Sequence, residues 1–199
     1  MRHFIYFSSS AATSGKALSK YADGGLMKAG RIDIAIHSFI QAVYLSEDFR
    51  KDVVFHFIFY GMPDPPKHIS IQVTDDLGLN KKDVGKIIQK LLYKYHEGEK
   101  AEVFPNCFIE KKSFLNVVEE LISSGNAIFI LDKNGEDLRK VKIPKNCAFI
   151  LGDHEGLPRA EIKSLKKNLS VKKVSIGDKM YFASQTVAVV NNELDYRNL

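Results

Sequence analysis

The stretch "FILGDHEGLPRAEI", Phe149 to Ile162, joins an apolar run to a polar segment of helical composition. The run from Ala148 to Leu151 stops abruptly, and the five residues Gly-Asp-His-Glu-Gly follow it. Glycine lets backbone N–H and C=O groups come close to a ligand. The stretch therefore predicts a buried strand, a short loop and then a helix, in which the loop is either only a turn or is shaped around a ligand.

Two other apolar segments in the last third of the chain end in the same way. "AIFIL" ends at Leu131 before "DKNGED", and "LSVKKVSIG" ends near Gly177 before "DKM". Further upstream, His3 to Ser9 predicts a first strand, and the apolar run from Asp52 to Gly61 predicts a strand buried on both faces. "HISIQV", His68 to Val73, alternates and predicts a half-buried strand.

Helical periodicity separates these strands. It predicts four helices, in residues 30–50, in Asn80 to Gly98, in Ser113 to Gly125 and in the final stretch around Val187. Asn80 is expected to cap the second of these helices, and Gly125 is expected to lie just past the end of the third. Short strands that alternate with helices favour an α/β fold, with a mainly parallel sheet flanked by helices. No linker interrupts the pattern, so residues 1–199 are expected to form a single domain.

Composition limits the function classes. The chain has 199 residues, of which 45% are hydrophobic, and its net charge is +5, which is compatible with a nucleic-acid partner. No apolar run approaches the roughly eighteen residues of a membrane span, and the N-terminus resembles a strand more than a signal peptide. Cys107 and Cys147 are far apart, so neither a metal site nor a disulfide framework is expected. We expect a cytoplasmic protein without a membrane or metal partner.

The three late loops share a chemistry. Ligands of open α/β sheets sit beyond the carboxyl ends of the strands, where these loops lie. The loops lack the glycine-rich phosphate-binding motifs, and they carry carboxylates that would repel a polyphosphate. Apolar strand ends at Leu131, Leu151 and Ile176 could hold a flat ring. S-adenosylmethionine, which combines an adenine with a cationic sulfonium, is one ligand of this kind.

The segments "FILGDHEGLP" and "VSIGDKMYFASQTVAVVNNELD" resemble the C-terminal motifs of the SPOUT, or α/β-knot, methyltransferases. This chain has three residues between the glycines of its first motif, one more than the simple family pattern. "AGRIDI", Ala29 to Ile34, and "FYGMPDPPKHI", Phe59 to Ile69, resemble the pseudouridine N1-methyltransferase branch, and within it the archaeal TrmY type. The similarity extends over essentially the whole chain.

The resemblance implies S-adenosylmethionine as cofactor, a homodimer, and a C-terminal trefoil knot within approximately residues 126–199. It also implies which residues line or approach the cofactor. They are Leu131, Leu151, Gly152, Asp153, Glu155, Gly156, Leu157, Ser175, Ile176, Gly177, Met180 and, where some relatives have a cysteine nearby, Ser184.

The implied reaction is methylation of pseudouridine 54 at N1, in the T-loop of tRNA. Asp64 is the candidate proton acceptor or N–H orienter, Arg31 could bind a phosphate or stabilise a ring carbonyl, and Asp33 could orient Arg31. The plainer alternatives are that Asp64-Pro65 is only a turn, and that Asp33 caps a helix beginning at Ile34.

Other interpretations stay open at this stage. The substrate could be ribosomal RNA, as for relatives in ribosome assembly, or the chain could be a non-catalytic RNA-binding protein of the same fold. His154 is expected at the surface, and Tyr181 and Phe182 at a subunit interface rather than stacked on bases. Three groups of basic residues could contact RNA phosphates, or could simply be solvated. The third group comprises Lys163, Lys166, Lys167, Lys172 and Lys173.

Overall fold

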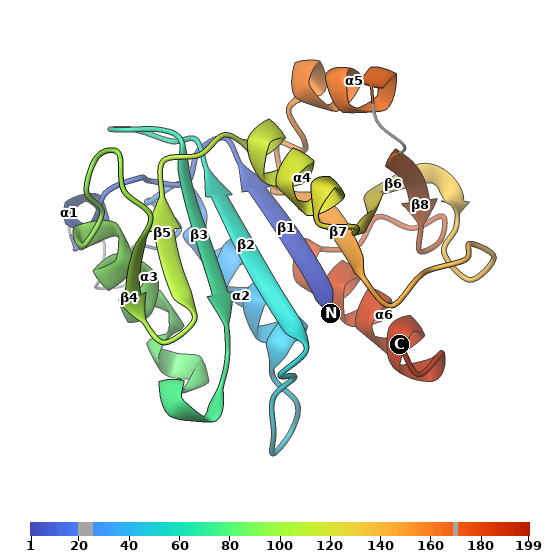
Figure 1. The fold of residues 1–199 in the computed structure, drawn as a ribbon, viewed down its shortest axis with the longest axis horizontal. Helices are drawn as coiled ribbons and strands as arrows, with labels where there is room; N and C mark the ends of the chain where they lie inside the picture. Colours follow the sequence, from blue (N-terminus) through green and yellow to red (C-terminus); the bar gives the residue numbers. More distant parts are fainter. Residues whose placement is uncertain (20–25, 169–170) are drawn as a thin grey trace.

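The protein is described here by a computed structural model, which covers residues 1–19, 26–168 and 171–199. One eight-stranded sheet runs through it in the order β4-β5-β3-β2-β1-β7-β6-β8 (Figure 1). The strands are β1 (Arg2–Ser8), β2 (Val53–Phe59), β3 (Lys67–Gln72), β4 (Ala101–Phe104), β5 (Cys107–Glu110), β6 (Ala127–Asp137), β7 (Cys147–Gly152) and β8 (Val171–Ser175).

The sheet is mainly parallel. β2, β1, β7, β6 and β8 form a continuous parallel set, whereas β3, β5 and β4 add antiparallel pairs at one edge. The predicted α/β fold class is thereby confirmed. The trefoil knot that the sequence resemblance implies stays a prediction.

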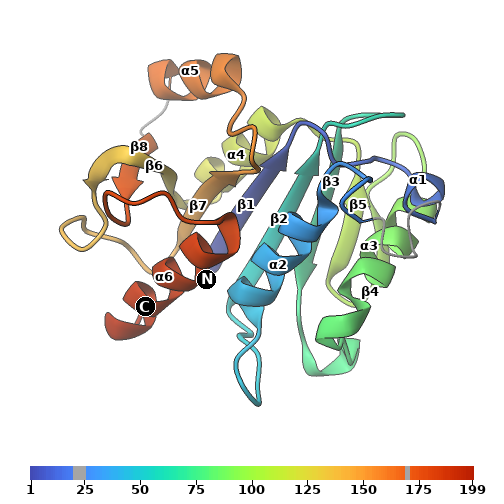
Figure 2. The same cartoon turned by 180° about the vertical axis from the view of Figure 1, so that it is seen from behind.

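Helices cover the two faces of the sheet. Figure 2 shows α2 and α6 side by side on one face, and Figure 1 shows α4 on the other. None of the helices among the described residues is long and apolar enough to cross a membrane. The helices are α1 (Gly15–Ser19), α2 (Ile32–Val43), α3 (Val84–Tyr93), α4 (Phe114–Ser123), α5 (Arg159–Asn168) and α6 (Ala183–Tyr196), with 3-10 turns η1 (Asp75–Leu77) and η2 (Lys81–Asp83).

The central strands explain why the sheet is buried on both sides. Successive side chains of a strand point to opposite faces. In β1, Phe4 and Tyr6 belong to the core beneath α2, and Ile5 and Phe7 belong to the core beneath α4. The near-continuous apolar run of β2 divides between the same two cores, which confirms its predicted burial on both faces.

Two predictions of local structure are wrong. β3 is buried on both faces rather than one, because the His68 ring lies between the His56 ring and the Glu110 carboxylate of the flanking strands. Asn80 does not cap α3: its side chain makes no capping hydrogen bond, and the turn η2 intervenes before the helix begins. The predicted start of α4 is confirmed, since the Ser113 hydroxyl accepts a hydrogen bond from the backbone N–H of Asn116.

The segment "DKNGED" is also not the simple loop that was predicted. β6 continues through it to Asp137, with a break in its pairing to β8 between Leu131 and Glu136. Gly135 allows this continuation because its backbone lies against β8: a Cβ there would be 2.5 Å from backbone atoms of Val174. The β4–β5 hairpin, whose turn holds Asn106 at a φ of 57°, was not predicted at all.

Candidate cofactor and RNA site

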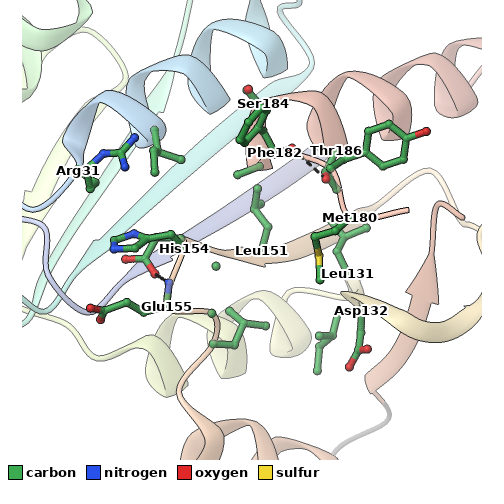
Figure 3. Close-up of a pocket in the computed structure, with 18 of the residues that line it drawn as sticks. Arg31, Leu131, Asp132, Leu151, His154, Glu155, Met180, Phe182, Ser184 and Thr186 are labelled. Carbon is green, nitrogen blue, oxygen red and sulfur yellow. Dashed lines mark hydrogen bonds between the residues drawn. The ribbon is translucent and has the colours of Figure 1, made fainter. Parts of the chain in front are cut away.

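A cleft of about 1130 Å³ opens where residues 130–132 of β6 and the carboxyl end of β7 face the N-terminal ends of α2 and α6 (Figure 3). The parallel register of β1, β7 and β6 brings these strand ends together at one edge. Most of the predicted cofactor residues line this cleft: Leu131, Leu151, Gly152, Asp153, Glu155, Gly156, Leu157, Met180 and Ser184.

The loop after β8 lies beside the same cleft. Ser175, Ile176 and Gly177 line a smaller recess that shares Leu131 and Met180 with the cleft. The Ser175 hydroxyl accepts a hydrogen bond from the Gly177 backbone N–H at 3.1 Å and lies 3.1 Å from the Gly177 carbonyl, to which it donates. All three loops singled out in the sequence therefore meet in one region.

The loop from Gly152 to Gly156, which follows β7, is a tight turn. The backbone N–H of Gly156 donates to the Asp153 carbonyl at 3.0 Å, and Gly156 has a φ of +85°, which favours glycine. At Gly152 a Cβ would lie 2.6 Å from the Gly156 carbonyl carbon. Both glycines are thus required by the turn itself, and the turn places its outer face on the cleft.

Asp153 holds this turn to the first strand. Its buried carboxylate accepts hydrogen bonds from the Ser8 hydroxyl at 2.6 Å and from the Glu155 backbone N–H at 2.8 Å. The Glu155 carboxylate is exposed and accepts a hydrogen bond from the Ser9 hydroxyl. Glu155 is therefore the more accessible of the two carboxylates for a ligand in the cleft.

The cleft suits an adenosyl ligand with positive charge. Leu131, Leu151, Leu157 and Met180 give it apolar walls that can hold a flat ring (Figure 3). The exposed carboxylate of Glu155 favours a cation over a polyphosphate. The residues present therefore fit S-adenosylmethionine. No group of three or more His, Cys, Asp or Glu side chains able to hold a metal ion occurs among the described residues.

Arg31 and Asp33 enter the cleft from the start of α2. The Nε and Nη2 atoms of the Arg31 guanidinium each donate a hydrogen bond of 3.0 Å to an oxygen of Asp33, which is the contact predicted from the sequence. Burial alone would raise the pKa of Asp33, but the hydrogen bonds and charge of Arg31 outweigh it and hold that pKa below its ordinary value. The prediction that Asp33 caps a helix beginning at Ile34 is wrong, because α2 begins at Ile32.

The backbone of Arg31 is strained. Its φ of 58° and ψ of 38° are in the left-handed region, which a non-glycine residue seldom adopts. Such conformations cluster at functional sites, where the surrounding structure holds them. Gly30, at a φ of +75°, is needed just before it, since a Cβ there would lie 1.8 Å from the Ser10 carbonyl oxygen.

Asp64 is not among the residues that line the cleft. Its carboxylate forms an ion pair with Lys111 and another, at 2.7 Å, with the buried ammonium of Lys67. Hydrogen bonds from these two lysines lower the pKa of Asp64. The structure therefore brings Arg31 and Asp33 to the predicted cofactor loops but leaves Asp64 apart from them.

The cleft also contains residues that the sequence analysis did not assign to it. His37 follows Asp33 by one helical turn, and Lys163 follows Arg159 by one turn, so helical spacing was the available signal. Lys173 joins them and pairs with Asp132. His154 lines the cleft with an exposed side chain, as expected. The side chains of Lys166 and Lys167 lie outside the described residues.

Fold and cleft together define an α/β protein that binds a nucleoside-type ligand beyond the carboxyl ends of its strands. All of residues 1–199 match the protein family described as "Putative SAM-dependent RNA methyltransferase". The chain belongs to this family, and it is an S-adenosylmethionine-dependent RNA methyltransferase. The resemblance to methyltransferases found in its sequence is confirmed.

Individual relatives share the full length of the chain. A tRNA (pseudouridine(54)-N(1))-methyltransferase of Methanocella arvoryzae is 34% identical over 99% of this chain and 100% of its own. A protein of Vibrio campbellii named "Putative pseudouridine methyltransferase" is 31% identical over 99% of both chains. The crystal structure of Archaeoglobus fulgidus Nep1 bound to S-adenosylhomocysteine has the same fold, with a TM-score of 0.63, 15% identity, and coverage of 100% of this chain and 99% of that one.

Proposed function

We propose that this protein transfers a methyl group from S-adenosylmethionine to N1 of pseudouridine 54 in the T-loop of tRNA. The observation that carries the proposal is that the 152–156 turn and Leu131 share one cleft with the Arg31–Asp33 pair, while the 175–177 loop lines the recess beside it. The full-length relative from Methanocella arvoryzae, which is named for this reaction, supports the same substrate. Action on tRNA would place the protein in the cytoplasm.

The proposed chemistry needs positioning more than acid–base strength. S-adenosylmethionine supplies a methyl group on a positively charged sulfur, which is already a good leaving group. The protein must align N1 of the base with that methyl group and stabilise negative charge on the ring as the N1 proton leaves. Apolar walls at Leu131, Leu151 and Met180 would orient the adenosine, and Glu155 would attract the positive end of the cofactor.

Basic side chains around the cleft would hold the RNA backbone. Arg31, just before α2, and Arg159 and Lys163, on α5, all line the cleft. Asp33 would keep the Arg31 guanidinium in one orientation through two hydrogen bonds. Binding through phosphate contacts would weaken steeply as salt concentration rises. Asp64 as proton acceptor stays a prediction, and its carboxylate oxygens form ion pairs with Lys67 and Lys111.

We further propose a homodimer. Met180, Tyr181 and Phe182 precede α6 at the mouth of the cleft, and their exposed fractions are 81%, 44% and 77%. Three consecutive large apolar side chains in solvent are typical of a surface that another protein covers. A second copy placed there would border the cleft, so that the RNA-binding surface would be shared between subunits.

The decisive experiment is mass spectrometry of nucleosides from a pseudouridine-54-containing tRNA after incubation with the protein and S-adenosylmethionine. N1-methylpseudouridine is the expected product, and the tRNA with uridine at position 54 is the control, because uridine N1 carries the sugar. Equal methylation of both RNAs would exclude N1 chemistry. Methylation of ribosomal RNA instead would favour a ribosome-assembly role, and binding of both RNA and cofactor without any transfer would favour a non-catalytic RNA-binding protein.

Variants at the RNA side test the residue roles. Arg31→Ala is expected to slow methyl transfer far more than it weakens RNA binding, because one guanidinium is a minor part of the total phosphate contact. Asp64→Asn tests the proton-acceptor prediction in the same assay. Unchanged turnover in both variants would remove these two residues from the mechanism but would leave the cofactor loops in place.

A further inference from the structure

Tyr6 lies in β1, beneath the floor of the cleft. It is paired in register with Leu151 of β7, which lines the cleft, and β1 runs behind Leu151 in Figure 3. Two residues further along, Ser8 donates its hydrogen bond to Asp153 of the cofactor turn. Because alternate residues of a strand share a face, the Tyr6 and Ser8 side chains point to the same side of the sheet.

The Tyr6 hydroxyl has no hydrogen-bond partner among the described residues, although its side chain is fully buried. A buried hydroxyl without a partner destabilises a fold, so native proteins seldom retain one without a role. The nearby carboxylates already have partners: Asp153 is held by Ser8 and by the Glu155 backbone, and Asp33 by Arg31. Tyr6 is not itself among the residues that line the cleft, so its hydroxyl can meet a bound group only after the side chains that cover it move.

The hydroxyl keeps its proton. Burial, together with the negative charges of Asp153 and Asp33, raises the pKa of Tyr6 far above its ordinary value, and the opposing effect of Arg31 is smaller. Tyr6 can therefore donate a hydrogen bond at neutral pH, and it cannot serve as a base. All three charged residues that act on it line the cleft.

We propose that the Tyr6 hydroxyl donates a hydrogen bond to the C2 carbonyl oxygen of the target pseudouridine, the oxygen next to N1. In the reaction, N1 forms a bond to the methyl carbon, the carbon–sulfur bond breaks with its electron pair left on sulfur, and the N1 proton passes to the acceptor, which is either Asp64 or water. Ring negative charge that develops at N1 is shared with this oxygen. A fixed donor there stabilises the transition state.

Base entry also requires movement of the groups beside Tyr6. The charges of Arg31 and Asp33 act on Tyr6, and their side chains are 37% and 22% exposed, so the proposal requires this pair to shift toward the RNA backbone when the base enters. The inference rests on the proposed function, because it names a contact to the base that the reaction would methylate.

The test replaces both ends of the proposed hydrogen bond. Tyr6→Phe removes the donor, and a T-loop RNA with 2-thiopseudouridine at position 54 replaces the acceptor oxygen by sulfur, a weaker acceptor. Single-turnover rates at saturating cofactor are measured for both proteins on both RNAs. We expect Tyr6→Phe to slow transfer to the oxygen-containing RNA roughly 10- to 100-fold, with unchanged affinity for S-adenosylmethionine. For the wild type, the rate on the oxygen-containing RNA should exceed the rate on the 2-thio RNA. This ratio should be smaller for Tyr6→Phe, because the variant already lacks the hydrogen bond that the sulfur weakens.

Tyr44→Phe is the matched control, since the Tyr44 hydroxyl donates to the Leu79 carbonyl at 2.6 Å and Tyr44 does not line the cleft. It should retain the wild-type ratio between the two RNAs and melt at a lower temperature, whereas Tyr6→Phe should melt no lower than the wild type. A wild-type rate and ratio in Tyr6→Phe would overturn the inference and leave a buried water as the partner. If Tyr6→Phe bound S-adenosylmethionine more weakly but transferred the methyl group at the wild-type rate, the inference would be overturned in favour of a contact between Tyr6 and the cofactor. If the wild-type protein methylates no pseudouridine, the proposed function fails first and the inference fails with it.

Discussion

The Ser8 hydroxyl and the Asp153 carboxylate form a hydrogen bond of 2.6 Å between residues 145 positions apart in the chain. It ties the end of the first strand to the turn that leads from β7 into the cleft. The same carboxylate accepts a hydrogen bond from the Glu155 backbone, so one buried side chain fixes both the position and the shape of the turn.

Asp153→Ala should loosen this turn and weaken cofactor binding. Loss of two hydrogen bonds to a charged group is expected to lower the free energy of unfolding by about 2–4 kcal/mol. Calorimetric titration with S-adenosylmethionine and denaturant unfolding measure the two effects. Asp76→Ala, at an exposed aspartate in η1, is the control and should change neither quantity. If Asp153→Ala bound cofactor like the wild type, the turn would not depend on its carboxylate.

Gly152→Ala should abolish cofactor binding. The new Cβ would lie 2.6 Å from the carbonyl carbon of Gly156, and backbone on a tight turn cannot yield without changing the turn. Gly85→Ala is the matched substitution, because its Cβ would meet the ends of the Ile36 and Leu26 side chains, at 3.3 and 3.9 Å, and alanine favours the helix. Binding of S-adenosylmethionine by Gly152→Ala with wild-type affinity would contradict the role of this turn.

Phe182→Asp should separate the proposed homodimer. Phe182 is 77% exposed beside Met180 and Tyr181, and a carboxylate buried in an apolar interface would be strongly unfavourable. Light scattering coupled to gel filtration measures the mass. Tyr196→Asp, at another large side chain that is 84% exposed but lies near the C-terminus, should leave the dimer intact. A monomeric wild-type protein at micromolar concentration would remove the dimer proposal.

A chain of three imidazoles should make stability depend on pH. His3 lies 3.0 Å from His56, His56 lies 2.9 Å from His68, and His68 lies 3.0 Å from the carboxylate of Glu110. The ionised Glu110 can only accept, so each ring donates from Nδ1, and His56 and His68 accept at Nε2. Protonation of His56 would leave two N–H groups facing each other.

The direction of the pH effect follows from the pKa values. Burial lowers the pKa of His56 and of His68, and burial and the N-terminal charge lower that of His3 to about 4. The unfolded chain therefore binds more protons than the folded protein below about pH 6.5, and stability falls as pH decreases from about 7 toward 4.

Denaturant unfolding at pH 7 and pH 5 measures this loss of stability. We expect a decrease on the order of 1–2 kcal/mol for each such histidine. His56→Gln should reduce the dependence on pH, and His96→Gln, at an exposed position, should not. Equal slopes for the wild type and His56→Gln would show that the imidazole chain does not control acid stability.

Much of the fold could be predicted from local pattern. Continuous apolar runs predicted the buried strands β1, β2 and β7, because a strand buried on both faces has no place for polar side chains. The failures occurred where tertiary contacts overrule pattern. β3 alternates like a half-exposed strand, yet its polar face is buried because His56 and Glu110 satisfy His68. The sequence of residues 132–137 suggests a loop, but pairing with β8 keeps it extended.

In the candidate site, too, some features follow from local sequence and others depend on tertiary packing. The sequence by itself determined where the glycine-bearing loops at the predicted cofactor site lie, because glycines after apolar strand ends are local features and the carboxyl ends of parallel strands meet at one edge of a sheet. It also predicted the Arg31–Asp33 contact, because the two side chains carry opposite charges and stand only two positions apart in the chain. Only the tertiary structure decided that Lys67 and Lys111 form ion pairs with Asp64, and that the buried hydroxyl of Tyr6 meets no hydrogen-bond partner within the described part of the chain. Those outcomes depend on which side chains meet across distant segments, and hydrogen bonding and burial are settled only when the whole chain packs.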